Sequence, residues 1–269
     1  GTPARAAASP WRGAAHAAAR LVTAAEATGS ARHLAAGIEI RVAPGWHTYW
    51  RSPGDAGVAP RIDWRGSQNL ARATLAWPAP RRFSLMGLDT IGYDGDVVLP
   101  VQVTLTRPGQ PARLRAALDY AVCAEICVPY HAALALALPA GPARTGPEAP
   151  LIARFAARVP KPAAADIALR RAVFDDSGGR LELRLVLAGT GPPFAGPDLF
   201  VEGAAGVSFG RPAVELADHG READLRVPVS GAKLADLLGK PLTLTVVDGR
   251  RAAEFSATPT AEASAAHYR

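Results

Sequence analysis

Short stretches of alternating apolar and polar residues, separated by glycine- and proline-rich turns, recur along most of this chain. Residues 37–42 (GIEIRV) form the clearest of them. The 269 residues include 26 glycines and 24 prolines, whereas aromatic residues make up only 6%. Such a composition favours short strands and many turns over long helices. We therefore predict an all-β fold.

The second half of the chain shows this pattern most regularly. Turn sequences at residues 175–179 and 248–249 separate its apolar segments, and only residues 233–238 indicate a helix. About seven short strands in about a hundred residues are typical of a β-sandwich. The predicted strands cover residues 168–174, 180–188, 198–201, 214–216, 223–229, 242–247 and 252–257.

The first half has a similar spacing of segments, so the sequence predicts two β-sandwich domains in tandem. Residues 52–57 and 78–95 are predicted loops. Pro100, inside one predicted strand, indicates an edge strand or a bulge, because proline cannot donate a hydrogen bond to a strand ladder. The predicted strands cover residues 20–27, 34–42, 61–64, 73–77, 97–106, 113–122 and 132–138.

A proline- and glycine-rich segment at residues 139–147 marks a boundary between the two domains. The spacing of apolar residues after it predicts a short amphipathic helix over residues 150–158, ended by Pro160. The expected organisation is a first domain over residues 18–140, a helix-bearing linker over residues 141–162 and a second domain over residues 163–260.

Charge and hydropathy argue against several classes of protein. The net charge is +6, but the basic residues are scattered among acidic ones, so nucleic-acid binding is not expected. No stretch reaches the roughly 18 apolar residues of a membrane helix. The alanine-rich start is broken by charged residues and is not a signal sequence. We expect a signal already removed or a soluble part of a larger protein, with loose tails at residues 1–17 and after Pro259.

The only two cysteines, Cys123 and Cys127, are four residues apart. A disulfide between them would be a weak staple, since closing about five residues stabilises a fold by only about 2 kcal/mol. The spacing therefore favours a redox-active pair over a purely structural one. In an extended strand the two Cα atoms would lie about 13 Å apart, too far for a disulfide. If the cysteines pair, residues 124–126 must form a turn.

Other kinds of site are less well supported by the sequence. The two cysteines with His47 or His131 could hold copper or zinc, but the spacing matches no zinc module. No motif indicates a serine hydrolase or a phosphate-binding loop. Close to the pair, Glu125 would oppose a thiolate, and His131 would favour one only if it folds back. We expect no cofactor.

Two groups of apolar side chains lie outside the clear strands. Trp46, Tyr49, Trp50 and Trp64 are interpreted as core or loop packing. The second group consists of Phe83, Leu85 and Met86, on a predicted loop flanked by glycine and proline. These three residues are either plain packing or a lid over the cysteines.

Three segments resemble a known family: GWHTYWRSPGD at residues 45–55, GYDGDVVLPV at residues 92–101 and VCAEICVP at residues 122–129. Together they are similar to the N-terminal periplasmic domain of the membrane thiol:disulfide interchange protein DsbD. The resemblance is closer to its ScsB relatives (suppressor of copper sensitivity), which carry two immunoglobulin-like domains in that region.

The resemblance implies a protein-disulfide reductase domain of a larger inner-membrane protein, located in the periplasm and connected with copper tolerance. Such a domain takes electrons from a transmembrane domain through a thioredoxin-like domain and reduces thioredoxin-fold partners of the ScsC or DsbC kind. It implies that Cys127 links to the partner and that Cys123 resolves the link. A cap loop would correspond to residues 83–87, with Met86 at the position of the cap's aromatic residue and Tyr93 adding to the partner surface. The competing hypothesis is a copper-binding or structural envelope module with an incidental disulfide.

Overall fold

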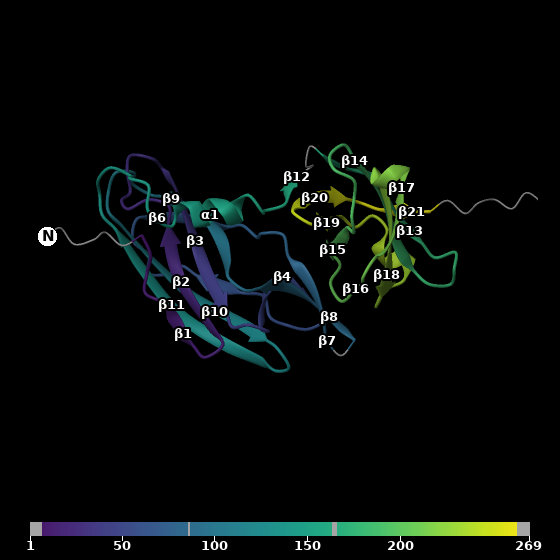
Figure 1. Ribbon diagram of the computed structural model, residues 1–269, viewed down its shortest axis with the longest axis horizontal. Helices are drawn as coiled ribbons and strands as arrows, with labels where there is room; N and C mark the ends of the chain where they lie inside the picture. The colour runs from purple at the N-terminus through teal and green to yellow at the C-terminus, as the bar shows by residue number, and fades with distance from the viewer. Residues whose placement is uncertain (1–6, 86, 163–165, 263–269) are drawn as a thin grey trace, which may run out of the picture. The chain divides into compact units, whose positions relative to one another are not determined.

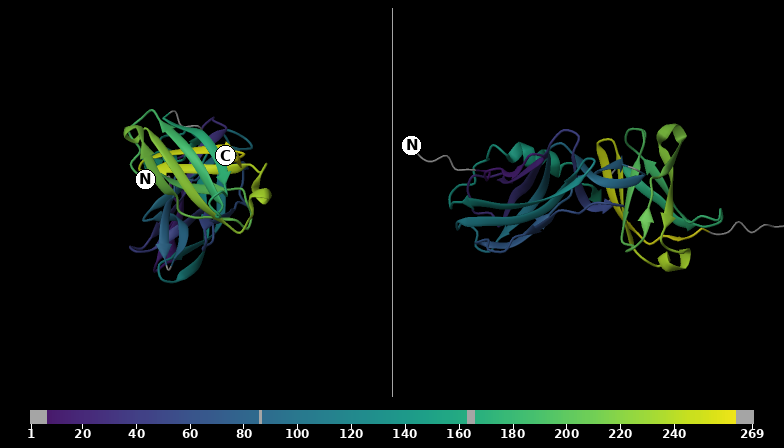
Figure 2. Two further views of the ribbon diagram at one scale, coloured as in Figure 1. Left: turned by 90° about the vertical axis from the view of Figure 1, so that its right-hand side faces the viewer. Right: turned by 90° about the horizontal axis from the view of Figure 1, so that it is seen from below.

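The computed structural model describes residues 7–85, 87–162 and 166–262. The chain divides into two compact units, residues 1–159 and 160–269. Each unit consists of two layers of mainly antiparallel strands (Figures 1 and 2). Apolar side chains fill the interior of each unit. The predicted all-β fold of two immunoglobulin-like sandwiches is confirmed.

The first unit pairs a sheet of order β1-β2-β3-β9-β6 with a sheet of order β11-β10-β4-β8-β7, and β5 also pairs with β10. Large apolar side chains such as Leu21, Ile38, Leu99 and Leu118 are fully buried between the layers. Burial of each side chain of this kind contributes about 1.5–3 kcal/mol. The strands are β1 (Arg12–Ala14), β2 (Ala17–Thr23), β3 (His33–Val42), β4 (His47–Gly54), β5 (Arg61–Asp63), β6 (Leu70–Leu75), β7 (Arg81–Leu85), β8 (Leu88–Asp94), β9 (Val97–Leu105), β10 (Ala112–Cys123) and β11 (Cys127–Leu138).

The predicted helix is present as α1 (Ala149–Ala156). It buries Ile152 and Phe155 and packs on β9 and β3. A proline in its first turn suits the helix start, where no backbone hydrogen bond is lost. The helix is therefore part of the first unit, although the sequence places it in a linker.

The prediction of a loose tail over residues 1–17 is wrong for its described part. β1 pairs with β2, Ala7 is buried, and the Ser9 hydroxyl accepts a hydrogen bond from the backbone N–H of Leu21 at 2.9 Å. The ring of Trp11 lies against the guanidinium groups of Arg20 and Arg41, at 4.7 and 4.4 Å from its centroid. Small alanines pack this segment, so it lacks the periodic large side chains that mark a strand in sequence.

Three further predictions for the first unit are wrong. Most of the predicted loop over residues 78–95 is a hairpin of β7 and β8, and the predicted loop over residues 52–57 begins inside β4. Pro100 is not on an edge strand, because β9 lies between β3 and β6. Its carbonyl accepts from Ala76, just after β6 ends, at 2.8 Å. The N–H that proline lacks would point to the same side, toward Ala76, which lies outside β6, so no hydrogen bond between strand residues is lost.

The second unit contains every strand predicted for it. One sheet has the order β12-β20-β19-β15 and the other β16-β18-β14-β13-β21, with β17 beside β18. The predicted helix is the short α2 (Leu234–Leu237). Phe174, Leu185, Leu225 and Leu244 lie in the core of the second unit. The strands are β12 (Lys161–Pro162), β13 (Ile167–Asp175), β14 (Glu182–Gly189), β15 (Asp198–Glu202), β16 (Ser208–Phe209), β17 (Ala213–Ala217), β18 (Glu222–Ser230), β19 (Leu242–Asp248), β20 (Arg251–Ala257) and β21 (Thr260–Ala261).

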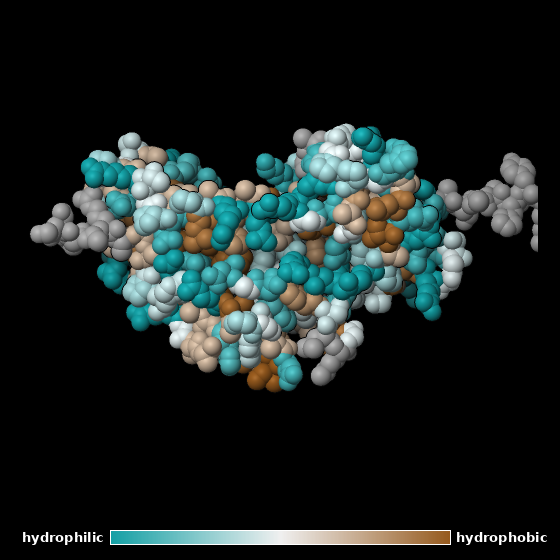
Figure 3. Space-filling model, viewed as in Figure 1, coloured by the Kyte–Doolittle hydropathy of each residue, from teal (hydrophilic) through white to brown (hydrophobic). Residues whose placement is uncertain are grey.

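The surface is mainly polar. On the face in Figure 3, hydrophobic residues form small separate patches surrounded by hydrophilic ones. Among the described residues, no helix is long and apolar enough to cross a membrane. Among the side chains that the structure describes in the first unit, the exposed large apolar ones are Val58, Leu88 and Ile126.

Candidate redox site

Cys123 and Cys127 form a disulfide at the tip of the β10–β11 hairpin. Cys123 is the last residue of β10, Cys127 is the first of β11, and the two face each other in the strand register. Their Cα atoms are 4.2 Å apart. The backbone N–H of Ala124 donates to the carbonyl of Ile126 at 3.1 Å, which closes the turn. The expectation that residues 124–126 form a turn if the cysteines pair is therefore confirmed.

The two sulfur-bearing residues differ in exposure. Cys123 is 5% exposed and packs with Tyr49 and Ala121 inside the sandwich. Cys127 is exposed, and Ile126 beside it is 65% exposed. Of the two residues, Cys127 is the one open to solvent, whereas Cys123 is covered by protein.

Tyr49 supplies a polar contact to the pair that the sequence did not indicate. Its side chain is fully buried, and its hydroxyl oxygen lies 3.3 Å from Sγ of Cys127. Burial raises the pKa of the Tyr49 hydroxyl, so the group keeps its proton near neutral pH. A disulfide sulfur carries no proton, so the hydroxyl is the donor in this contact. The sequence indicates only a packing role for Tyr49, because the position of Tyr49 beside Cys127 depends on strand pairing.

His47 is the second neighbour of the pair that appears only in the fold. It faces Cys123 in the β4–β10 register and is 8% exposed. Its ring stacks on Phe83 with centroids 4.5 Å apart, and it meets Tyr49 edge-on at 5.4 Å. Nε2 lies 3.3 Å from the hydroxyl oxygen of Thr90. Burial lowers the pKa of His47, and the charge of Asp94 partly opposes that shift.

The residues predicted for the cap occupy different environments. Phe83 lies on β7 and stacks on the His47 ring. His47 in turn pairs with Cys123 of the disulfide across β4 and β10. Met86 and the side chain of Leu85 lie outside the described residues. Tyr93 is only 4% exposed and donates its hydroxyl proton to the carbonyl of Pro78 at 2.8 Å, a buried position that does not fit the predicted partner contact.

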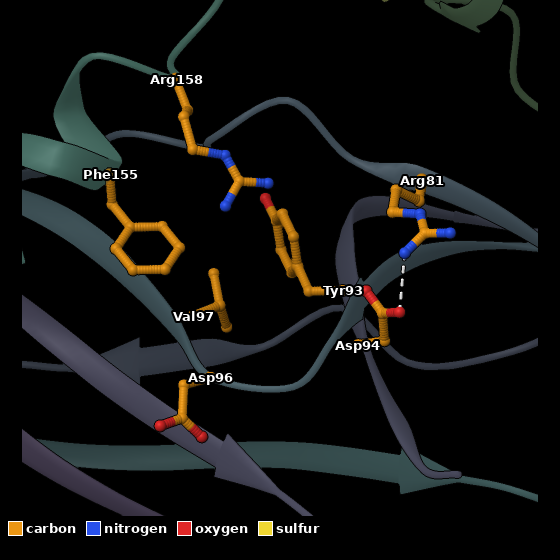
Figure 4. A pocket seen from close by; sticks show the side chains of 7 residues that line it. All are labelled: Arg81, Tyr93, Asp94, Asp96, Val97, Phe155 and Arg158. Carbon is orange, nitrogen blue, oxygen red and sulfur yellow. Dashed lines mark hydrogen bonds and ion pairs between the residues drawn. The ribbon is translucent and has the colours of Figure 1, made fainter. Parts of the chain in front are cut away.

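Tyr93 lines a small pocket between β8 and α1, shown in Figure 4. Arg158 extends toward its hydroxyl from the end of α1, and Arg81 pairs with Asp94 at 2.7 Å on the other side. Burial raises the pKa of Tyr93 well above that of a free tyrosine. This side chain therefore stays neutral and helps to fix β8 in the first unit.

The geometry gives little support to a metal site. His131 pairs with Asp119 at 2.7 Å on the exposed face of the hairpin. Within the described parts of the chain, no three histidine, cysteine, aspartate or glutamate side chains gather closely enough to hold a metal ion. The metal-binding hypothesis thus lacks a ligand set here.

Comparison with known proteins agrees with this geometry. Residues 18–139 match the family described as the N-terminal domain of the thiol:disulfide interchange protein DsbD. The first unit is a DsbD N-terminal domain. Residues 158–262, beyond this DsbD domain, match a domain family of unknown function (DUF8393).

A solved structure matches the DsbD domain and the second unit together. It is the N-terminal periplasmic domain of ScsB from Proteus mirabilis, a DsbD family member, with 26% sequence identity and a TM-score of 0.76. The similarity covers 95% of this chain and 99% of that chain. No curated protein matches the sequence. The family match and the paired cysteines make the DsbD domain a thiol:disulfide interchange domain.

Gly57 of the DsbD domain leaves room for the Tyr49 ring. Gly57 has φ +122°, and a Cβ there would lie 2.2 Å from the Tyr49 ring. We expect Gly57→Ala to displace the ring and to lower the free energy of unfolding by about 1–3 kcal/mol, the usual cost of overpacking. Urea denaturation of the oxidised protein measures this loss.

Gly95→Ala is the matched control for this change. Gly95 also has a positive φ, +68°, but a Cβ there would meet nothing within 4 Å. It should therefore cost only the backbone strain of a non-glycine residue. Equal losses for the two variants would show that contact with Tyr49 does not matter at Gly57.

Proposed function

We propose that this chain is a periplasmic relay domain that passes electrons from a membrane-bound reductase to thioredoxin-fold proteins through a reversible Cys123–Cys127 disulfide. The observation that supports it best is the unequal exposure of the two cysteines, with Cys127 open to solvent and Cys123 covered. A relay needs one sulfur that a partner can reach and one that acts only within the domain.

The proposed chemistry consists of two exchanges. A thiolate of the reduced upstream partner attacks Sγ of Cys127, and the disulfide bond breaks as Cys123 leaves as a thiolate. The partner's second thiolate then attacks its own sulfur in the mixed disulfide and releases Cys127. The domain has gained two electrons and, after protonation, two thiols, while the partner has become a disulfide.

The second exchange returns the domain to its oxidised form. The Cys127 thiolate attacks the disulfide of the target, and one target thiolate leaves. Cys123 then attacks Sγ of Cys127, which rebuilds the intramolecular disulfide and releases the target as a dithiol. The hairpin register that holds Cys123 opposite Cys127 favours this second step, because the resolving sulfur is already in place.

The partners and location in this proposal come from the relatives. The matching ScsB structure is described as a periplasmic domain, and the family is one of thiol:disulfide interchange proteins. A thioredoxin-like domain and a transmembrane domain of the same full-length protein would supply the electrons. ScsC-like or DsbC-like proteins would receive them, and a part in copper tolerance belongs to the same proposal. The second unit contains no cysteine, so its role would be scaffolding or partner docking.

Electron exchange with a thioredoxin-fold protein tests the proposal. The reduced chain is mixed with an oxidised disulfide isomerase of thioredoxin fold, and free thiols are alkylated and counted by mass spectrometry over time. We expect the chain to lose two thiols as the isomerase gains two. The double variant Cys123→Ser/Cys127→Ser is the control and should transfer nothing. A pair that stays oxidised in millimolar dithiothreitol would contradict the relay.

A further inference from the structure

Two exposed apolar side chains, Val58 and Ile126, border the disulfide. Ile126 is 65% exposed and immediately precedes Cys127 in the hairpin turn. Val58 is 56% exposed and comes from a different element, the loop between β4 and β5. Single exposed apolar residues are common on soluble proteins. Here, two of the three that the structure describes on the first unit lie beside the cysteine that is open to solvent.

The loop that carries Val58 is placed beside the disulfide by Tyr49. Gly57, the residue before Val58, packs so closely on the Tyr49 ring that a Cβ there would lie 2.2 Å from Cε1 of the ring. The hydroxyl oxygen of the same ring lies 3.3 Å from Sγ of Cys127. One aromatic ring therefore bridges the backbone next to Val58 and the sulfur that a partner would attack.

Backbone contacts hold both side chains in place before a partner arrives. At the start of the loop, the N–H of Asp55 donates to the carbonyl of Asp89 at 2.8 Å, and the N–H of Asp89 donates to the Asp55 carboxylate at 3.0 Å. At its end, Pro60 is buried. In the hairpin turn, the carbonyl of Ile126 accepts from the N–H of Ala124. Side chains on a backbone that is already ordered lose less conformational entropy when they bind.

Exchange through Cys127 would bring a partner against these side chains. The two sulfurs of a mixed disulfide are only about 2.05 Å apart, so the surface around the partner's reactive cysteine must lie on whatever surrounds Sγ of Cys127. Transient redox complexes bury small areas, and a few residues near the centre of an interface carry most of its binding energy. Apolar side chains at such a place contribute binding energy without burying a charge.

We propose that Val58 and Ile126 form a docking rim around Cys127, which binds an uncharged, apolar surface bordering the reactive cysteine of a thioredoxin-fold partner. This inference rests on the proposed function, which supplies the partner, and adds the residues of this chain that set the affinity for it. Neither side chain takes part in the sulfur chemistry. They determine how well a protein partner binds, and not how reactive the disulfide is.

Exchange rates of single variants test the docking rim. The reduced chain is mixed with increasing concentrations of an oxidised disulfide isomerase of thioredoxin fold, and the transfer of thiols is followed by alkylation and mass spectrometry. In Val58→Ser and in Ile126→Ser, the second-order rate constant should fall roughly five- to twentyfold. The loss should appear as a higher half-saturating concentration of the isomerase, with the rate at saturation retained. Val58→Ile and Ile126→Leu, which restore an apolar side chain, should recover most of the loss.

Reduction by dithiothreitol separates docking from reactivity. This small reagent needs no protein surface, so it should reduce the oxidised serine variants at rates close to that of the unchanged chain. Serine variants that slow both reactions equally would place the effect on the disulfide itself and overturn the docking rim. Exchange with the isomerase at the unchanged rate in both serine variants would overturn it as well. An unchanged chain that transfers no thiols to the isomerase would instead contradict the relay, and the docking rim with it.

Discussion

Cys123→Ser is expected to accumulate a mixed disulfide with its thioredoxin-fold partner, whereas Cys127→Ser is expected to lose exchange altogether. The lone Cys127 of the first variant is exposed and can attack a partner disulfide, but no second thiol remains in the domain to resolve the adduct. The lone Cys123 of the second variant is 5% exposed, so a partner cannot reach it. Non-reducing electrophoresis after acid quenching separates the adduct from the free chain.

The difference between the two single variants tests the role assigned to each cysteine. Cys127→Ser should transfer no more electrons than the double variant, a loss of several orders of magnitude, since a relay needs a thiolate at the accessible position. If Cys127→Ser formed the adduct as fast as Cys123→Ser, the roles assigned to the two cysteines would be contradicted. A chain that exchanges normally after either change would remove the relay from consideration.

Tyr49→Phe is expected to slow alkylation of the reduced Cys127 near neutral pH by roughly three- to tenfold, because the Cys127 thiolate loses a hydrogen-bond donor. Hydrogen bonds to charged groups contribute about 1.5–3 kcal/mol, and the exposed thiolate places this one at the lower end. The buried Tyr49 hydroxyl keeps its proton and can donate to the thiolate as it forms. The rate of iodoacetamide alkylation of the reduced chain against pH yields the thiol pKa.

Tyr120→Phe is the matched control for the loss of a buried hydroxyl. Tyr120 is also buried on β10, and its hydroxyl has no hydrogen-bond partner among the described residues. Burial, assisted by Tyr130, raises its pKa to about 12, so it stays neutral. Its removal should leave the Cys127 profile unchanged. An identical shift in the two variants would mean that the effect comes from altered packing rather than from the hydrogen bond.

The strands that sequence predicts well are those whose side chains alternate strictly between core and solvent. β14 and β18 of the second unit are of this kind, and their burial alternates as the sequence does. The β7–β8 hairpin is not predicted by the sequence because charged side chains that form ion pairs, such as Arg81 with Asp94, replace a regular alternation of apolar and polar residues. β1 is not predicted by the sequence because it is three residues long with every residue exposed, so it carries no alternation of apolar and polar side chains.

The chemistry of the site was predictable, but its surroundings were not. The spacing of the two cysteines predicts a turn between them if they pair, and it favours a redox-active pair. Both expectations depend only on residues that are close together in the sequence. The contact of Tyr49 with Cys127 joins residues 78 positions apart in the chain. It depends on which strand lies beside β10 and in which register, and the irregular pairing of β4 with β8 adds a shift that no pattern shows.

The ladder between β10 and β11 has a consequence for the redox cycle as a whole. It pairs residues continuously from Ala112 with Leu138 up to Cys123 with Cys127, so the hairpin is held closed by its backbone whether or not the sulfurs are bonded. The small loop that the disulfide closes adds only about 2 kcal/mol in the chain-entropy account. The reduced form should therefore melt only about 4–8 °C below the oxidised form. The surface offered to a partner should then keep its shape through the proposed redox cycle, and the two states would differ mainly in their sulfur chemistry.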